Sequence, residues 1–198
     1  MIMLRIDADL LLRQLTEMDA VPLFNAIDRN RVYLRQWLPW LDTSRSPDDT
    51  LNFIRSTLDQ FANNDGFAAG IWYKDAVVGT IGFHKVDWLN RSVEIGYWLS
   101  ADCQGKGIVT RSCIAFIDHA FSEWHLHRVQ IRCAVGNSKS CRIPERLGFV
   151  REGVQRHAEF LYDHYADLII YGMLESEWKG KRLALKSQFD ANLRDDQV

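Results

Sequence analysis

The sequence lacks a long apolar run and an excess of charge of either sign. Its 198 residues include 24 Lys and Arg against 26 Asp and Glu, a formal net charge of −2. Such a chain has no global attraction to nucleic acid or to an anionic membrane, so we expect direct binding to neither. No stretch is long and apolar enough to cross a bilayer. Residues 1–15 carry Arg5, Asp7, Asp9 and Arg13, unlike the apolar core of a signal peptide, and we expect a cytoplasmic protein.

Cysteine is also scarce, and its spacing excludes two kinds of site. Cys103, Cys113, Cys133 and Cys141 form no CxxC pair and fit no zinc spacing with the six histidines. We therefore expect no bound metal. In a cytoplasmic protein these thiols stay reduced, and core packing is their default role.

Turn and cap signals divide the chain into the elements of one mixed domain. Ser46-Pro47-Asp48-Asp49 combines an N-cap, a proline at the first helical position and acids near the positive helix end. We predict helices over residues 20–29, 47–62, 107–121 and 138–147, and strands over 4–15, 67–73, 77–86, 93–99, 128–135, 149–154 and 167–174. This order predicts a mixed α/β (α+β) fold with helices on both faces of the sheet.

The junction after the strand over 93–99 is the most informative segment. There Gln104-Gly105-Lys106-Gly107-Ile108-Val109 ends a loop and opens a helix. Glycines let the backbone approach a ligand and adopt positive φ. Free N–H groups at a helix start bind anions, and Lys106 adds a positive charge. The segment predicts a pyrophosphate-binding turn, with tight glycine packing as the alternative.

The same residues exclude two common nucleotide motifs. In a Walker loop, Gly-Lys is followed by Ser or Thr, whereas here Gly105-Lys106 is followed by Gly107. The dinucleotide pattern GxGxxG is incomplete and does not follow a first strand. Gly96, in the preceding strand, predicts a bulge or weak pairing that exposes backbone groups to an extended ligand.

A second motif follows downstream, in Asn137-Ser138-Lys139-Ser140 and then Leu147-Gly148-Phe149. Together the two motifs resemble the acyl-CoA loop (Q/R-x-x-G-x-G/A) and the N-x-x-S helix of the GNAT superfamily of N-acetyltransferases. The resemblance covers about residues 4–174, and it departs at Val109, where Gly or Ala is usual. It implies a GNAT acyltransferase fold, with a central, mostly antiparallel sheet splayed at the acyl-CoA strand. It also implies one acetyltransferase domain over residues 1–175 and a charged C-terminal helix or tail over 176–198.

Within the superfamily the chain resembles the RimL-type branch, on residues 37–40, 95–99, 104–108, 158–161 and 165–167. This resemblance implies direct transfer from acetyl-CoA to the α-amino group of a protein N-terminus, ribosomal ones included. An α-amine has a pKa of about 7.7–8.0 against about 10.4 for lysine, which makes it the easier acceptor. The alternatives are a small-molecule amine, such as a polyamine or an antibiotic, and an acyl-CoA-binding module without catalysis. The sequence leaves the oligomeric state open, with a homodimer as one alternative.

The resemblance also assigns catalytic roles. Glu159 would take the proton of the amine, and Ser140 would donate to the sulfur of CoA. Glu94 is the alternative base, unless it pairs with an arginine such as Arg91 or Arg128. A covalent relay through Cys133 is conceivable, with core packing as its default.

Residues of the loop and of its preceding strand are expected to bind acetyl-CoA. The backbone N–H of Trp98 or Leu99 would polarise the thioester carbonyl, and Asn137 would hold the pantetheine arm or cap a helix. The candidates for the acceptor side are His84, His157, Tyr33, Trp37 and Trp40. The full set expected to bind the co-substrate is Tyr97, Trp98, Leu99, Gln104, Gly105, Lys106, Gly107, Ile108, Val109 and Asn137.

Overall fold

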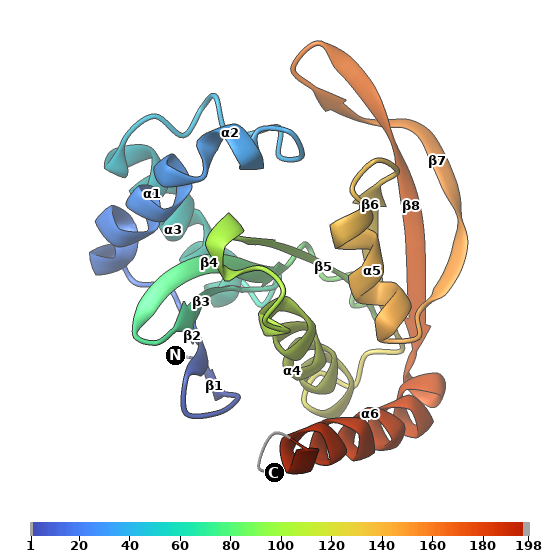
Figure 1. Ribbon diagram of the computed structural model, residues 1–198. Coiled ribbons are helices and arrows are strands. Elements are labelled where there is room, and N and C mark those ends of the chain that lie inside the picture. The colour runs from blue at the N-terminus through green and yellow to red at the C-terminus, as the bar shows by residue number, and fades with distance from the viewer. Residues whose placement is uncertain (1, 196–198) are drawn as a thin grey trace.

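One eight-stranded sheet runs through the molecule in the order β1-β2-β3-β4-β5-β6-β8-β7 (Figure 1). The computed structural model describes residues 2–195, and the side chains as far as residue 185. The strands are β1 Met3–Arg5, β2 Leu10–Gln14, β3 Ala68–Tyr73, β4 Ala76–Phe83, β5 Ser92–Leu99, β6 Arg128–Ala134, β7 Val150–Leu161 and β8 His164–Leu174. The helices are α1 Ala20–Arg29, α2 Arg31–Leu34, α3 Pro47–Ala62, α4 Ile108–Ser122, α5 Ser138–Arg146 and α6 Glu175–Asp195.

The sheet opens between β5 and β6. These two strands are parallel, and they pair only where residues 92–94 lie beside residues 128–130. Beyond that point β5 stays on β4, in register from Phe83 and Ile95 to Gly79 and Leu99, while β6 stays on β8. All the other strand pairs are antiparallel. The predicted splayed and mostly antiparallel sheet is therefore confirmed.

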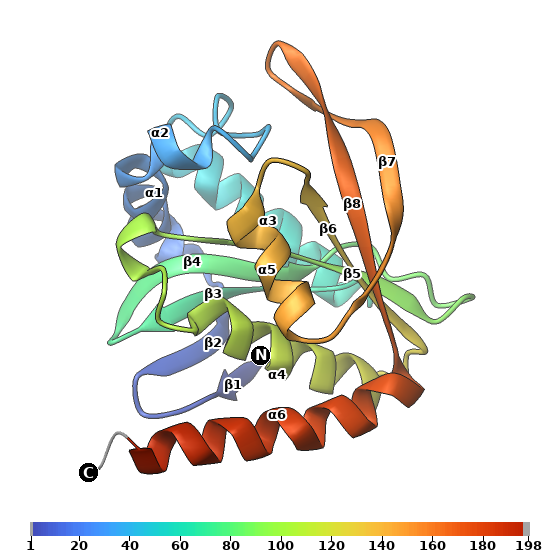
Figure 2. The same ribbon diagram turned by 45° about the vertical axis from the view of Figure 1, so that its right-hand side comes forward.

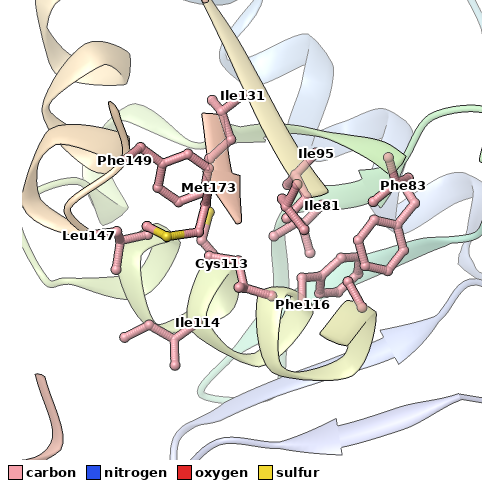
Figure 3. Close-up of a cluster of buried hydrophobic side chains, with 14 of the residues drawn as sticks. Ile81, Phe83, Ile95, Cys113, Ile114, Phe116, Ile131, Leu147, Phe149 and Met173 are labelled. Carbon is pink, nitrogen blue, oxygen red and sulfur yellow. The ribbon is translucent and has the colours of Figure 1, made fainter. Parts of the chain in front are cut away.

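Helices cover both faces of the sheet (Figure 2). Each face of the sheet has its own apolar core beneath the helices. On one face, α4 buries Cys113, Phe116 and Ile117 against strand residues such as Ile81 and Ile95 (Figure 3). On the other face, α1 and α3 pack Leu23, Ile27 and Ile54 against Val77 and Trp98. The predicted placement of helices on both faces is confirmed. All four cysteines are buried and unbridged.

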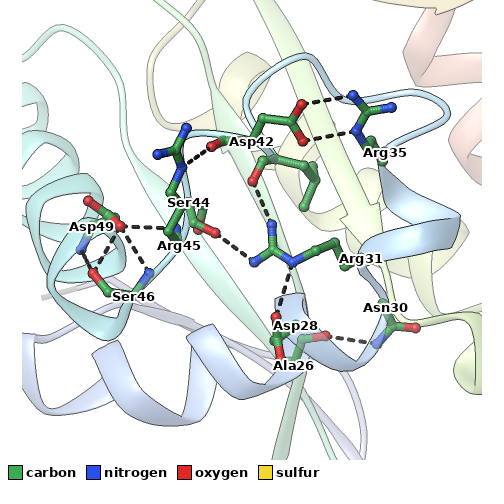
Figure 4. A network of polar contacts seen from close by, with 11 residues as sticks. Ala26, Asp28, Asn30, Arg31, Arg35, Asp42, Ser44, Arg45, Ser46 and Asp49 are labelled. Carbon is green, nitrogen blue, oxygen red and sulfur yellow. Dashed lines mark hydrogen bonds and ion pairs between the residues drawn. The ribbon is translucent and has the colours of Figure 1, made fainter. Parts of the chain in front are cut away.

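Helix α3 begins where its cap signal predicts. Ser46 accepts a hydrogen bond from the N–H of Asp49, whose carboxylate accepts one from the N–H of Ser46 (Figure 4). Arg31 donates to the carbonyls of Leu41 and Ser44, at 2.6 Å each. These bonds fix the segment between α2 and α3, which carries the aromatic residues of the site described below.

Three sequence predictions need correction. The strand predicted over 4–15 is two antiparallel strands, because Asp7 accepts hydrogen bonds from the N–H groups of Asp9 and Leu10 and turns the chain. The helix α2 was not predicted. The last two strands are longer than predicted and form a hairpin. Register shifts interrupt their pairing, and the polar sequence of β7 alternates only weakly, so its length was not evident.

The C-terminal helix packs under α4. Trp178 donates to Asp118 at 2.8 Å, Arg182 pairs with the same carboxylate, and Leu185 is buried in the α4 core. The boundary predicted between residues 175 and 176 stays a prediction, and residues 196–198 of the predicted tail lie outside the described residues. Within residues 2–195, no helix combines the length and apolar character needed to span a membrane.

Candidate active site

The glycine loop ends at the start of α4 and leaves that start free of side-chain caps. Gly107 is the N-cap residue with φ 68°, and Gly105 has φ 77°, both in the left-handed region that favours glycine. The first turn of α4 contains no acidic residue. The first N–H groups of the helix therefore remain available to an anion, reinforced by the helix dipole.

These amides open into a groove of about 350 Å³ between α4 and α5. Of the ten residues predicted to bind the co-substrate, nine line it: Tyr97, Trp98, Leu99, Gln104, Gly105, Gly107, Ile108, Val109 and Asn137. Lys106 is not among the described lining residues, and its Nζ lies 5.6 Å from the centre of the Tyr73 ring. Val109 is half-buried and packs against the α4 core as well as lining the groove.

Three cations on α5 supply charge that the sequence reasoning missed. Lys139, Arg142 and Arg146 line the same groove, and Lys139 also donates to Gln104 at 2.7 Å. Their spacing of three and four residues puts them on one face of the helix. The sequence signal for these three cations is their helical spacing, which begins at Lys139 within the N-x-x-S motif.

A second cavity, of about 700 Å³, lies on the other side of the opened sheet. Its walls include His84, Glu94, Glu159, Trp37 and Trp40. It shares with the groove the residues Trp37, Leu38, Tyr97, Trp98, Asn137 and Ser140. The two cavities therefore meet at the β5–α5 gap.

Ser140 lies at this junction with two other protic groups. Its hydroxyl is 3.3 Å from the Tyr97 hydroxyl and 3.3 Å from the Cys133 sulfur, and the Tyr97 hydroxyl donates to the Ser140 carbonyl at 3.2 Å. Burial raises the pKa of Cys133 to about 12 and that of Tyr97 well above its usual value. Both groups stay protonated at neutral pH, which disfavours Cys133 as a nucleophile. Asn137 caps α5 by accepting from the N–H of Ser140 at 3.1 Å.

The hydrogen-bond alternation of β5 selects one backbone donor at the gap. The Glu94 carbonyl accepts from His84, and the Ser100 N–H donates to Val78. Since alternate residues of a strand face the same neighbour, the N–H of Trp98 also faces β4, whereas that of Leu99 faces the gap. Of the two predicted donors, the geometry favours Leu99.

Glu159 and Glu94 differ in their surroundings. Glu159 is half-buried on β7, and burial raises its pKa, with Glu94 adding to the rise and Arg132 opposing it. Glu94 accepts from Arg132 at 2.6 Å and from Gln130 at 3.2 Å. The arginine paired with Glu94 is thus Arg132, and neither of the two arginines considered from the sequence.

A register shift in β7 directs Glu159 into the cavity. Between Gln155 and Glu159 the strand carries extra residues relative to β8, and His157 has φ 50°. The N–H of His157 donates to Asp167 at 2.8 Å, which holds this bulge. The prediction that His157 lies on the acceptor side is wrong: His157 lines a separate surface hollow with Arg156 and is not among the residues that line the second cavity.

The family follows from a comparison with known sequences. Residues 9–150 match the acetyltransferase (GNAT) domain. This chain belongs to the GNAT acetyltransferase family. The Bacillus subtilis protein YdaF, which carries the name of a ribosomal N-acetyltransferase, is 36% identical over 179 residues, 90% of this chain and 98% of its own. The Escherichia coli ribosomal-protein-serine acetyltransferase is 32% identical over 86% of this chain and 96% of its own.

Solved acetyltransferase structures share the fold. The ribosomal L7/L12 α-N-protein acetyltransferase RimL, in complex with coenzyme A, superposes with a TM-score of 0.84 at 25% identity, covering 87% of this chain and 98% of its own. That complex contains a disulfide between CoA and a cysteine. The predicted recognition, fold and enzyme class are confirmed.

In this acetyltransferase the aromatic candidates divide between the two cavities. Tyr33 lines the groove, Trp40 lines the second cavity, which is called the acceptor cavity from here on, and Trp37 lines both. The tip of the β7–β8 hairpin reaches the same segment, as the Tyr162 hydroxyl donates to the Leu38 carbonyl at 2.5 Å (Figure 1). The guanidinium of Arg35 lies 3.7 Å from the Tyr162 ring centre. The hairpin therefore bridges one side of the acceptor cavity, a contact between distant segments that the sequence motifs did not predict.

Proposed function

We propose that this acetyltransferase moves the acetyl group of acetyl-CoA directly to the α-amino group of a protein N-terminus, of the ribosomal-protein type. One observation carries the proposal. A groove with free helix amides and cations meets, at Ser140, a separate cavity that holds the half-buried carboxylate of Glu159. An acyl donor and an amine entering from opposite sides would come together at that junction.

The groove suits the phosphates and pantetheine arm of acetyl-CoA. Helix amides and the side chains of Lys139, Arg142 and Arg146 match the charge of a pyrophosphate. Val109 keeps the loop compatible with this ligand, because its side chain is partly accommodated by the α4 core. The complex of RimL with coenzyme A supports the same assignment.

The chemistry assigns one role to each group at the junction. Glu159 accepts a proton from the amine, and burial favours this by raising its pKa toward the working pH. The Leu99 N–H donates to the carbonyl oxygen of the thioester as negative charge develops there. Ser140 donates its hydroxyl proton to the sulfur as the thiolate leaves. The alternative is that Glu159 is an exposed strand carboxylate without a catalytic role. The burial that raises the pKa of Glu159 counts against that alternative.

The acceptor is assigned from the relatives and from amine chemistry. Two relatives are named for ribosomal proteins, and an α-amine gives up its proton more readily than lysine. A small amine is the second candidate, since spermidine N(1)-acetyltransferase of Vibrio cholerae is 26% identical over 52% of this chain. The microcin C7 self-immunity acetyltransferase MccE, solved with acetyl-CoA and AMP, is 29% identical over 85% of this chain with a TM-score of 0.82. A cavity of about 700 Å³ has room for such ligands.

Two measurements test the proposal. Acetyl-CoA at about a hundred times its dissociation constant should stabilise the protein by about 2.7 kcal/mol, and NADH and ATP should not. Turnover is then compared between peptides that begin with Ser or Ala, the same peptides with a blocked α-amine, and a panel containing spermidine. Turnover of the free peptides alone supports the proposal, whereas turnover of the small amines alone replaces it by the second candidate. A cytoplasmic location and a homodimer are further predictions. Cell fractionation tests the location, and light scattering tests the oligomeric state.

A further inference from the structure

Acetylation of a protonated amine removes two protons from nitrogen. Forming the C–N bond and breaking the C–S bond leaves an amide and a thiolate, and the thiolate takes up one proton. The second proton must reach solvent. Glu159 is half-buried, and it can hold only one proton at a time. A site with a second acceptor open to water would separate these two transfers.

His84 stands where such an acceptor is needed. It follows β4 and lines the acceptor cavity together with Glu94 and Glu159. Its side chain is 62% exposed, so a proton on the ring has a direct route to water. Its backbone is fixed, because its N–H donates to the Glu94 carbonyl at 2.9 Å. Imidazole is also the side chain that changes charge most readily between pH 5 and pH 8.

Gly96 makes room for the imidazole over β5. A Cβ atom at this position would lie 2.5 Å from Nε2 of His84, closer than any van der Waals contact allows. Gly96 is not among the glycines with positive φ, so its backbone conformation does not call for glycine. The ring of His84 fills the space that Gly96 leaves. The ring therefore lies over β5 one residue before Tyr97, at the gap between β5 and α5.

Glu94 is placed to orient this ring. One of its oxygens, Oε1, lies 3.9 Å from Nε2 of His84, and the other is held by Arg132 and Gln130. The charged or titratable groups around the ring are Glu94 from β5, Arg132 from β6, Glu159 from β7 and the adjacent Lys85. The ion pair with Arg132 holds Glu94 as a fixed carboxylate beside the imidazole.

We propose that His84 is a second proton acceptor of the acetyl-transfer site, and that Glu94 positions it. The inference rests on the acetyl transfer proposed above. His84 takes the first proton from the ammonium group and releases it to solvent. Glu159 takes the second as the nitrogen attacks the thioester. Ser140 gives its hydroxyl proton to the leaving thiolate, and the proton held by Glu159 then restores the hydroxyl of Ser140, so that both groups return to their starting states and one proton in total reaches solvent. Glu94, considered from the sequence as a base, is here a positioning residue.

The test compares His84→Ala and His84→Gln with the wild-type enzyme on its best amine. Near pH 7 we expect kcat/KM to fall by about a hundredfold, the lower end of the range for one proton-transfer group. The melting-temperature rise with acetyl-CoA should be unchanged, because His84 does not line the groove. His164→Ala is the matched control, since that exposed imidazole lies at the hairpin tip beside Asp163, and its activity should equal wild type.

Two further readouts separate proton transfer from a structural role. The deficit should shrink toward pH 9, because an α-amine loses its proton unaided above about pH 8. Added imidazole should restore part of the activity of His84→Ala and leave the activity of His164→Ala unchanged. Glu94→Gln should show a smaller deficit with the same pH dependence. An equal deficit at every pH without imidazole rescue, or no deficit at all, would overturn the proposal.

The outcome is distinguishable from failure of the proposed function. If the wild-type enzyme acetylates only small amines, the assignment of a protein N-terminus fails. The comparison at His84 then proceeds with the small amine that turns over, read at pH values that bracket that amine's own pKa. The same loss and rescue would support His84, and their absence would overturn it.

Discussion

The two cavities that meet at Ser140 are built in different ways. The groove takes most of its polar groups from two contiguous segments, the loop and first residues of α4 over 104–109 and the helix α5 with its cap over 137–146. The acceptor cavity takes its walls from the segment between α2 and α3, from β4 and β5, and from the β7–β8 hairpin. The groove offers amides and permanent cations, while the cavity offers the carboxylates of Glu94 and Glu159 and the imidazole of His84. Binding of the donor is thus separated from control of the acceptor's protons.

This division predicts that the two functions can be damaged independently. Changes in the cavity should reduce turnover and leave the affinity for acetyl-CoA intact. Changes in the groove should weaken binding of acetyl-CoA. Ser140 is one of the six residues that line both, and the separation should break down at such positions.

The largest expected effect is that of Glu159→Gln. Removing a proton-transfer group typically costs about a hundredfold to ten-thousandfold, and we expect kcat/KM for the acceptor to fall within that range. The dissociation constant of acetyl-CoA, measured by calorimetry, should stay within about twofold of wild type, since Glu159 does not line the groove. Glu123→Gln, at the exposed end of α4, is the control. Unchanged turnover would remove Glu159 from the mechanism and leave the fold untouched.

Ser140→Ala should have the next largest effect. We expect kcat to fall about a hundredfold, because the leaving thiolate loses its donor and the hydroxyl of Tyr97 loses a neighbour at 3.3 Å. Pre-steady-state acetyl transfer, measured by rapid quench, should slow by the same factor. Ser138→Ala, at the exposed first position of α5, should be silent. If the rates of the two variants match, the assignment of Ser140 as donor is wrong.

Gly107→Ala should act on the groove alone. An alanine at φ 68° costs about 1–2 kcal/mol, so we expect the melting temperature to fall by about 2–8 °C and acetyl-CoA to bind several-fold more weakly. Gly153→Ala is the control, because no atom lies within 4 Å of its added Cβ and its φ is not positive. An acetyl-CoA affinity equal to wild type would show that the loop does not need its left-handed turn to bind the donor.

The same contrast explains which parts of the site could be predicted from the sequence. The groove was predictable, because Gln104–Val109 and Asn137–Ser140 are local patterns whose geometry follows from strand ends and helix starts. The cavity was only partly predictable, since Glu94, Arg132 and Glu159 come together through strand pairing across the splayed sheet. The bulge that aims Glu159 depends on a register shift, which the alternation of β7 does not reveal. Gly96 was predicted to mark a bulge or weak pairing. No bulge is present, because β4 and β5 pair there without a register shift, whereas the pairing of β5 with β6 ends before it, at Glu94.

The smallest expected effect concerns the stability cost of Glu159. Burial raises the pKa of this carboxyl in the folded protein, so folding favours its protonated form. The resulting stabilisation is fully present below the pKa of the unfolded chain and is lost as the pH rises through the folded pKa. At pH 7 the wild type therefore carries a partly desolvated charge that Glu159→Gln lacks. We expect the variant to melt about 1 °C higher at pH 7, a shift that about 0.3–0.5 kcal/mol gives in a domain of this size, with the difference shrinking below about pH 4. Calorimetric scans at both pH values, with Glu123→Gln as the exposed control, decide this. A variant that is less stable at pH 7 would mean that the attraction of Arg132 outweighs burial, and the acceptor cavity would then stabilise its carboxylate rather than strain it.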